Sequence, residues 1–124
     1  MLWLLGYIYG KVTELRNSLY DKGVLDVFDL GASVISVGNL TAGGTGKTPL
    51  VAHITKILHA RGETVCILTR GYGRKDPKRR VVVTDGKRIL TDAEHSGDEP
   101  FDLAKKLLGK VIIIADADRV SAGE

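Results

Sequence analysis

The hydrophobic positions of the first 21 residues recur every three or four residues, which is the spacing of one helix face. They are Leu4, Leu5, Ile8, Val12, Leu15 and Leu19. Trp3 stands among them, and the cations Lys11, Arg16 and Lys22 follow. The apolar stretch is shorter than the ~20 residues that span a bilayer. A signal peptide is not expected either, because no basic residue precedes the apolar stretch. Two alternatives stay open: an interfacial membrane helix, which the pattern favours, or a helix packed on its own domain.

Beyond residue 33, short apolar runs alternate with longer amphipathic stretches, as expected for strands alternating with helices. Strands are predicted at 34–37, 64–69 and 111–115, with a hairpin that pairs 80–83 with 88–90 around Asp85-Gly86. Helices are predicted at 50–58 and from Ser96 or Asp98, either of which can cap, to about 108. This order predicts an α/β fold with a mostly parallel sheet, whose ligands lie at the carboxyl ends of the strands.

Composition narrows the class of protein. The chain has 124 residues, of which 44% are hydrophobic and 27% charged, so it forms one small ordered α/β domain at most. Six cations crowd into positions 70–80: Arg70, Arg74, Lys75, Lys78, Arg79 and Arg80. Such a cluster suits nucleic acid, phosphates or acidic lipid headgroups, or it forms a solvated loop. The single cysteine, Cys66, is predicted to be a buried apolar residue, so no disulfide or metal framework is expected.

A glycine-rich turn at residues 39–49 ends in Gly-Lys-Thr between a predicted strand and a predicted helix. Glycines in such a turn let successive N–H groups point at one anion. Lys47 would reach the β- and γ-phosphates of a nucleotide, and the Thr48 hydroxyl would hold Mg²⁺. The predicted ATP-binding residues are Thr41, Ala42, Gly43, Gly44, Thr45, Gly46, Lys47 and Thr48. The general motif has glycine where this chain has Thr41, and the deviant loop of partition ATPases has lysine where it has Ala42.

Four segments occur in the same order as in a known family: 36–49, 68–74, 97–100 and 118–119. Through them the chain closely resembles the tetraacyldisaccharide 4'-kinase family of lipid A biosynthesis, in which threonine at position 41 is usual. Residues 16–23 also resemble the end of that family's N-terminal helix. The resemblance runs through essentially the whole chain and covers about the first third of a typical member.

The resemblance implies a P-loop kinase that moves the γ-phosphate of ATP to the 4'-hydroxyl of a tetraacyl glucosamine disaccharide 1-phosphate, with Mg²⁺. It implies a peripheral protein at the cytoplasmic face of the bacterial inner membrane. The expected partners are the lipid-linked disaccharide and an anionic membrane surface, with no nucleic acid and no protein partner.

The resemblance also assigns roles to residues. Asp98 matches the proposed catalytic base and Glu99 its acidic neighbour, while Lys47 and Thr48 keep their phosphate and metal roles. Arg119 matches a catalytic arginine near the transferring phosphate. The acceptor is expected to face Arg70 and Tyr72.

Simpler alternatives exist for these charges. Asp98 and Glu99 could be acids that only stabilise the start of a helix, and Arg119 could be a surface residue. Asp116 closes an apolar strand as a metal-binding carboxylate of a P-loop protein would. It stays unassigned because the resemblance places the metal-binding acids in a later strand.

Two regions are therefore expected: an amphipathic helix at 1–22 and part of a P-loop kinase domain at 33–124. We expect the 124-residue chain to be a fragment that does not transfer phosphate alone. The alternatives are a P-loop ATPase of the assembly or partition type and a non-catalytic module that binds nucleotide or membrane.

Overall fold

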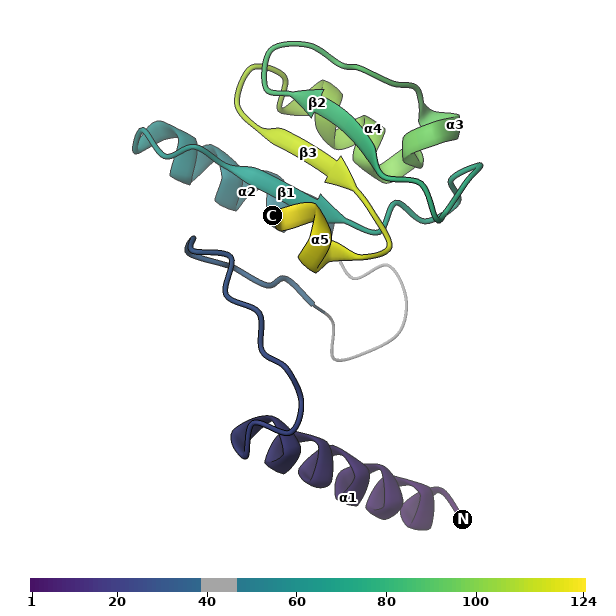
Figure 1. Cartoon of the computed structure of the whole chain (residues 1–124). Helices are drawn as coiled ribbons and strands as arrows, with labels where there is room; N and C mark the ends of the chain where they lie inside the picture. Colours follow the sequence, from purple (N-terminus) through teal and green to yellow (C-terminus); the bar gives the residue numbers. More distant parts are fainter. Residues whose placement is uncertain (39–46) are drawn as a thin grey trace. The chain divides into compact units, whose positions relative to one another are not determined.

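The computed structural model describes residues 1–38 and 47–124, and the chain divides into two units, Met1–Ala32 and Ser33–Glu124. The first unit is dominated by α1 (Leu2–Asp21), as the apolar spacing predicts (Figure 1). The helix ends where Gly23 takes a φ of 68°, a left-handed conformation that glycine adopts readily. None of the α1 residues is buried within this unit. Across the two described ranges, no helix combines the length and apolarity required to cross a membrane.

The second unit contains a three-stranded sheet in the order β1-β3-β2. Its elements are α2 (Lys47–Ala60), β1 (Cys66–Thr69), β2 (Val81–Asp85), α3 (Ala93–Ser96), α4 (Asp98–Lys106), β3 (Ile112–Ala115) and α5 (Arg119–Gly123). β1 runs parallel to β3 with Thr69 opposite Ala115, and β2 runs antiparallel with Val81 also opposite Ala115. The ends of β1 and β3 and the start of β2 therefore share one edge of the sheet, here called the carboxyl edge.

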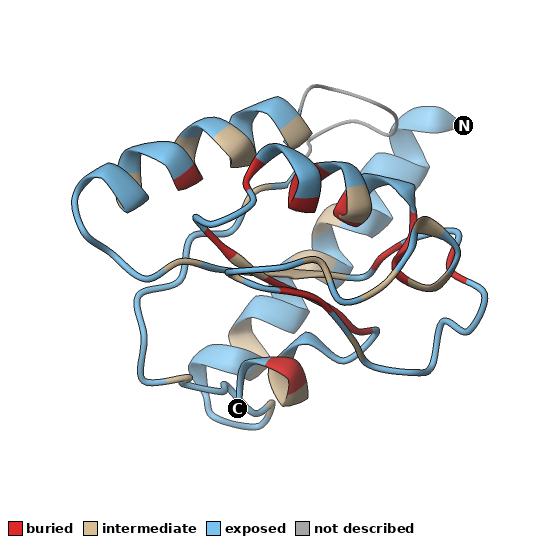
Figure 2. Cartoon of the chain, turned by 90° about the horizontal axis from the view of Figure 1, so that it is seen from above, coloured by how far each residue is buried: buried red, intermediate tan, exposed pale blue. Residues whose placement is uncertain are grey.

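Helices cover both faces of this sheet. α2 and α4 lie on one face and α5 on the other (Figure 2). The core lies between α4 and the sheet, where Val83, Leu107 and Ile113 are fully buried. Burying side chains of this size contributes about 1.5–3 kcal/mol each. This packing fixes the start of α4 relative to the strand ends.

The α/β class is confirmed, but the sheet is mixed, because the first arm of the predicted hairpin joins it as the antiparallel strand β2. The second arm is reduced to one bridge between Thr84 and Ile89 and one hydrogen bond from the Leu90 N–H to the Val83 carbonyl.

Two predictions about the strands of this fold are wrong. Residues 34–37 form no strand, and Val34 and Ile35 are 69% and 59% exposed. A strand needs a neighbour for its backbone groups, and none of the three strands of the described sheet pairs with these residues. Cys66 is exposed, because it is the first residue of a strand that lies at the side of the described sheet. Partial burial nevertheless raises the pKa of its thiol.

Candidate active site

The first turns of α2 and α4 meet at Thr48 and Glu99. The Thr48 hydroxyl donates a hydrogen bond to Oε1 of Glu99. Both residues lie at helix N-termini, where unpaired N–H groups and the helix dipole favour an anion. A hydroxyl and a carboxylate held together are oxygen ligands of the kind that Mg²⁺ prefers. The residues therefore fit the expected metal site.

Two glycines bring the loop after β1 against the start of α4. A Cβ atom on Gly97, whose φ is 92°, would lie 2.8 Å from the carbonyl oxygen of Tyr72. A Cβ atom on Gly71, whose φ is 62°, would lie 2.5 Å from the Ser96 carbonyl oxygen. Only backbones without side chains can approach so closely. The exposed residues Arg70 and Tyr72 thus belong to a loop that touches the residues preceding Asp98.

The predicted caps of this helix are wrong. Gly97 occupies the cap position of α4 with no side-chain hydrogen bond, and Asp98 is the first helical residue. Ser96 is buried instead, and its hydroxyl donates to the Asp92 carbonyl oxygen at 2.7 Å. Asp98 stays exposed and takes no part in capping, while its charge suits the positive end of the helix. The structure leaves its carboxylate accessible from solvent.

Arg119 reaches the same edge of the sheet from β3, as the first residue of α5. Asp116, the residue after β3, is almost fully buried and pairs with Arg80 at 2.8 Å. The Arg80 hydrogen bond and the Asp118 N–H hold the pKa of the Asp116 carboxyl below its usual value. Within the described ranges, Arg119 makes no hydrogen bond or ion pair with Thr48 or the acids that start α4.

The cluster of cations at 70–80 does not form one solvated face. Arg74 is 5% exposed, and its guanidinium donates to the carbonyl oxygens of Pro77, Arg79 and Ala115 at 2.6, 2.6 and 3.0 Å. It therefore ties the loop to the end of β3. Sequence reasoning missed this role, because nothing distinguishes Arg74 from its neighbours in a run of cations. Its one possible signal is its position directly after Gly73.

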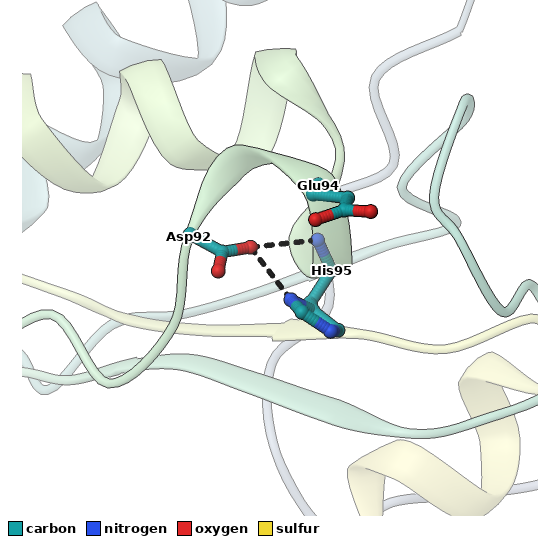
Figure 3. Close-up of side chains that lie close together, drawn as sticks. All are labelled: Asp92, Glu94 and His95. Atoms are coloured by element: carbon teal, nitrogen blue, oxygen red, sulfur yellow. Dashed lines mark hydrogen bonds and ion pairs between the residues drawn. The ribbon is translucent and has the colours of Figure 1, made fainter.

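Asp92, Glu94 and His95 form a second polar cluster, shown in Figure 3. Their candidate ligand atoms lie within 4.8 Å of one another. Asp92 caps α3, since its Oδ1 accepts from the backbone N–H of His95 at 3.0 Å and contacts the His95 Nδ1 at 2.7 Å. Glu94 pairs with Lys75 at 3.2 Å. Capping and ion pairing account for this cluster without a metal.

A hollow of about 280 Å³ lies at the other edge of the sheet. It is lined by residues such as Val65 and Val111, which precede β1 and β3. Ligands of α/β sheets bind at the carboxyl ends of strands, so we assign no function to it.

Not all predicted site residues can be placed. Thr41, Ala42, Gly43, Gly44, Thr45 and Gly46 lie outside the described residues. Lys47 and Thr48 are the first two residues of α2, as the motif requires. The helix prediction for 50–58 is confirmed by this element.

An α/β fold in which Lys47 and Thr48 open helix α2, directly after a glycine-rich sequence, is typical of a nucleotide-binding domain of the P-loop class. Residues 1–124 match the family described as Tetraacyldisaccharide-1-P 4'-kinase, and the chain belongs to that family.

Relatives support the same assignment. The tetraacyldisaccharide 4'-kinase of Geobacter sulfurreducens is 45% identical over 116 residues, 94% of this chain and 33% of that protein. The same-named kinase of Aquifex aeolicus is 44% identical over 117 residues, 94% of this chain and 36% of that protein. A crystal structure of Aquifex aeolicus LpxK in complex with ATP superposes with a TM-score of 0.78 at 43% identity, covering 94% of this chain and 36% of the other. The chain thus spans about a third of these proteins.

Proposed function

We propose that this chain forms the nucleotide-binding part of a kinase that transfers the γ-phosphate of ATP to the 4'-hydroxyl of a tetraacyl glucosamine disaccharide 1-phosphate. The observation that carries the proposal is the hydrogen bond between Thr48 and Glu99, in a chain that matches 4'-kinases over its whole length. Glu99, which together with Thr48 would hold Mg²⁺, directly follows Asp98 in the sequence. We take residues 33–124 as part of the kinase domain.

Each residue of this edge has a task in the proposed reaction. Phosphoryl transfer depends on positioning and charge neutralisation more than on covalent chemistry. Thr48 and Glu99 would hold Mg²⁺, which when bound neutralises charge on the phosphate oxygens. Asp98 would accept the proton of the attacking hydroxyl, a contribution of about 10²–10⁴ in rate.

The cations complete the proposed site. Lys47 would bind the β- and γ-phosphates, and Arg119 would stabilise charge on the phosphate being transferred. The loop with Arg70 and Tyr72 would face the sugar acceptor, since Tyr72 is 78% exposed where the loop meets Gly97.

We infer that α1, within residues 1–22, lies on an anionic membrane surface at the cytoplasmic face of the bacterial inner membrane. Leu5 and Leu15 are 59% and 63% exposed, and Trp3 is 81% exposed. Cations accompany the aromatic rings, with Lys11 5.9 Å from the ring centre of Tyr7. Exposed apolar and aromatic side chains flanked by cations are typical of interfacial helices.

Calorimetric titration of the chain with Mg-ATP tests the nucleotide site. Lys47→Ala should weaken binding by about 1.5–3 kcal/mol, the worth of a charge-assisted hydrogen bond. Lys56→Ala removes the same charge further along α2 and should leave the affinity unchanged. Equal affinities for wild type and Lys47→Ala would remove the phosphate-site assignment.

Transfer itself is tested in a protein of the relatives' full length, with labelled ATP and the disaccharide lipid. Asp98→Asn should lower turnover about 10²-fold or more with little change in ATP affinity, because a base acts on the acceptor hydroxyl. Asp102→Asn, on the same helix, is the matched control. Near-normal turnover of Asp98→Asn would reduce Asp98 to a residue that stabilises the helix.

A further inference from the structure

Both carboxylate oxygens of Asp116 are committed to protein groups. Oδ2 accepts a hydrogen bond from Nε of Arg80 at 2.8 Å, and Oδ1 accepts from the Asp118 N–H at 3.0 Å. The residue is 6% exposed. These contacts use about two of the four lone-pair sites of the carboxylate and tie the residue after β3 to Arg80 and to the turn at Asp118.

The same contacts continue into the first turn of α5. Oδ1 of Asp118 accepts from the N–H groups of Val120 and Ser121 at 3.1 and 3.2 Å. Arg80 also donates from Nη2 to the Ser121 hydroxyl at 2.6 Å. Five residues are too few for a helix that is stable without outside support. The turn that carries Arg119 is therefore held from two sides, by Asp118 within it and by Arg80 and Asp116 from the sheet.

The register of the sheet explains why these groups meet. Val81 of β2 and Ala115 of β3 are opposite each other, so Arg80 and Asp116 are the next residues out from a paired position at the carboxyl edge. The Asp116 N–H donates to the Thr69 carbonyl oxygen at 2.9 Å, which fixes this residue to the end of β1 as well. The Arg80–Asp116 pair is thus attached to the ends of all three strands, and a shift of any strand would move it.

We propose that Arg80 and Asp116 are positioning residues for Arg119, which fix the first turn of α5 so that the Arg119 guanidinium meets the terminal phosphate of the nucleotide. This inference rests on the proposed function. It adds that the acid after β3 acts by holding the turn that carries an arginine. A misplaced arginine would lose its contact with the γ-phosphate, whereas the contacts that Lys47 would make with the phosphates would remain.

The test measures the ratio of Mg-ATP to Mg-ADP affinity of the chain by calorimetry. Asp116→Asn should reduce the preference for Mg-ATP about 10-fold, as should Arg119→Gln, because each removes the contact with the third phosphate. The double variant should resemble Arg119→Gln alone, since both changes act on one contact. Ser121→Ala, which removes one hydroxyl from the network, should shift the ratio in the same direction by a smaller factor and covers the case that Asp116→Asn does not fold.

Asp85→Asn is the matched control. Asp85 also accepts from two backbone N–H groups, those of Lys87 and Arg88, and pairs with Arg88, but at the other end of β2. It should leave the ratio unchanged. An unchanged ratio in Asp116→Asn and Ser121→Ala, with weaker binding in Lys47→Ala, would overturn the positioning role and keep the proposed nucleotide site. Unchanged binding of both nucleotides in Lys47→Ala would instead contradict the proposed function.

Discussion

The Thr48 hydroxyl donates to the Glu99 carboxylate, which joins the first turns of two helices whose residues are 51 positions apart in the sequence. The bond sits where both helices begin, so it sets the separation of their N-termini. A cation bound by either oxygen would lie within reach of the other. Thr48 and Glu99 should therefore act as one unit.

Glu99→Gln should weaken Mg-ATP binding about 10-fold, because the amide cannot supply the negative charge that a hard cation prefers. Binding of ATP in EDTA should not change. Thr48→Val should have a similar effect, and the double variant should be no weaker than the stronger single one. Titrations with and without Mg²⁺ measure this. Additive losses of affinity in the double variant would show that the two residues act independently. An equal loss of ATP affinity in EDTA would show that they do not act through the metal. Glu63→Gln, just beyond α2, serves as the control.

Gly97→Ala should destabilise the second unit more than Gly62→Ala does. Both glycines have positive φ values, 92° and 83°, and alanine there costs roughly 1–2 kcal/mol. A Cβ at Gly62 meets nothing within 4 Å, whereas at Gly97 it would lie 2.8 Å from the Tyr72 carbonyl oxygen. Urea unfolding of both variants measures the destabilisation that comes from the contact with Tyr72. Equal free energies of unfolding would show that the Tyr72 loop moves away from the added Cβ with no loss of stability.

Acidification should reduce the stability advantage of wild type over Asp116→Asn. The pKa of Asp116 is lowered in the folded state, first by the hydrogen bond from Arg80. Its contribution is therefore present above the unfolded value, about 3.9, and is lost as pH falls through the folded pKa. The free energies of unfolding of the two proteins should keep their difference from pH 7 down to about pH 4 and converge from there down to the folded pKa of Asp116. A constant difference across this range would mean that the Asp116 charge is not coupled to folding.

Deletion of residues 1–21 should release the protein from vesicles that contain anionic lipid. Each cation near the surface contributes about 1 kcal/mol, and the attraction is screened by salt. Cosedimentation at low and high salt measures it. Leu5→Asp places a charge on the apolar face and should weaken binding, while Thr13→Asp in the same helix is the control for added negative charge. Unchanged sedimentation of the deletion variant would favour a helix packed on its own domain.

Local pattern was sufficient to predict the elements that carry a strong period or a turn signal. The apolar spacing predicted α1 and α2, and Asp85-Gly86 marked the end of β2. The strand predicted at 34–37 failed because a strand depends on a partner elsewhere in the chain. β2 entered the sheet beside β3 for the same reason, a pairing that no local pattern encodes.

The candidate site shows the same division. The phosphate-loop motif predicted Thr48 as a site residue and the family resemblance predicted Glu99, and a hydrogen bond joins the two. The burial of Arg74 and the pairing of Arg80 with Asp116 were not predicted, since both depend on strand register. The local sequence around a charged residue in a polar run does not indicate whether the folded protein will bury that residue.

The backbone contact between the loop at Gly71 and the helix start at Gly97 also has a consequence for recombination between family members. Each segment is shaped to the bare backbone of the other. A chimera that takes residues 68–74 from one parent and 96–100 from another would combine surfaces that were not fitted together. The two stretches are best exchanged as a single cassette, although more than twenty residues separate them in the printed sequence.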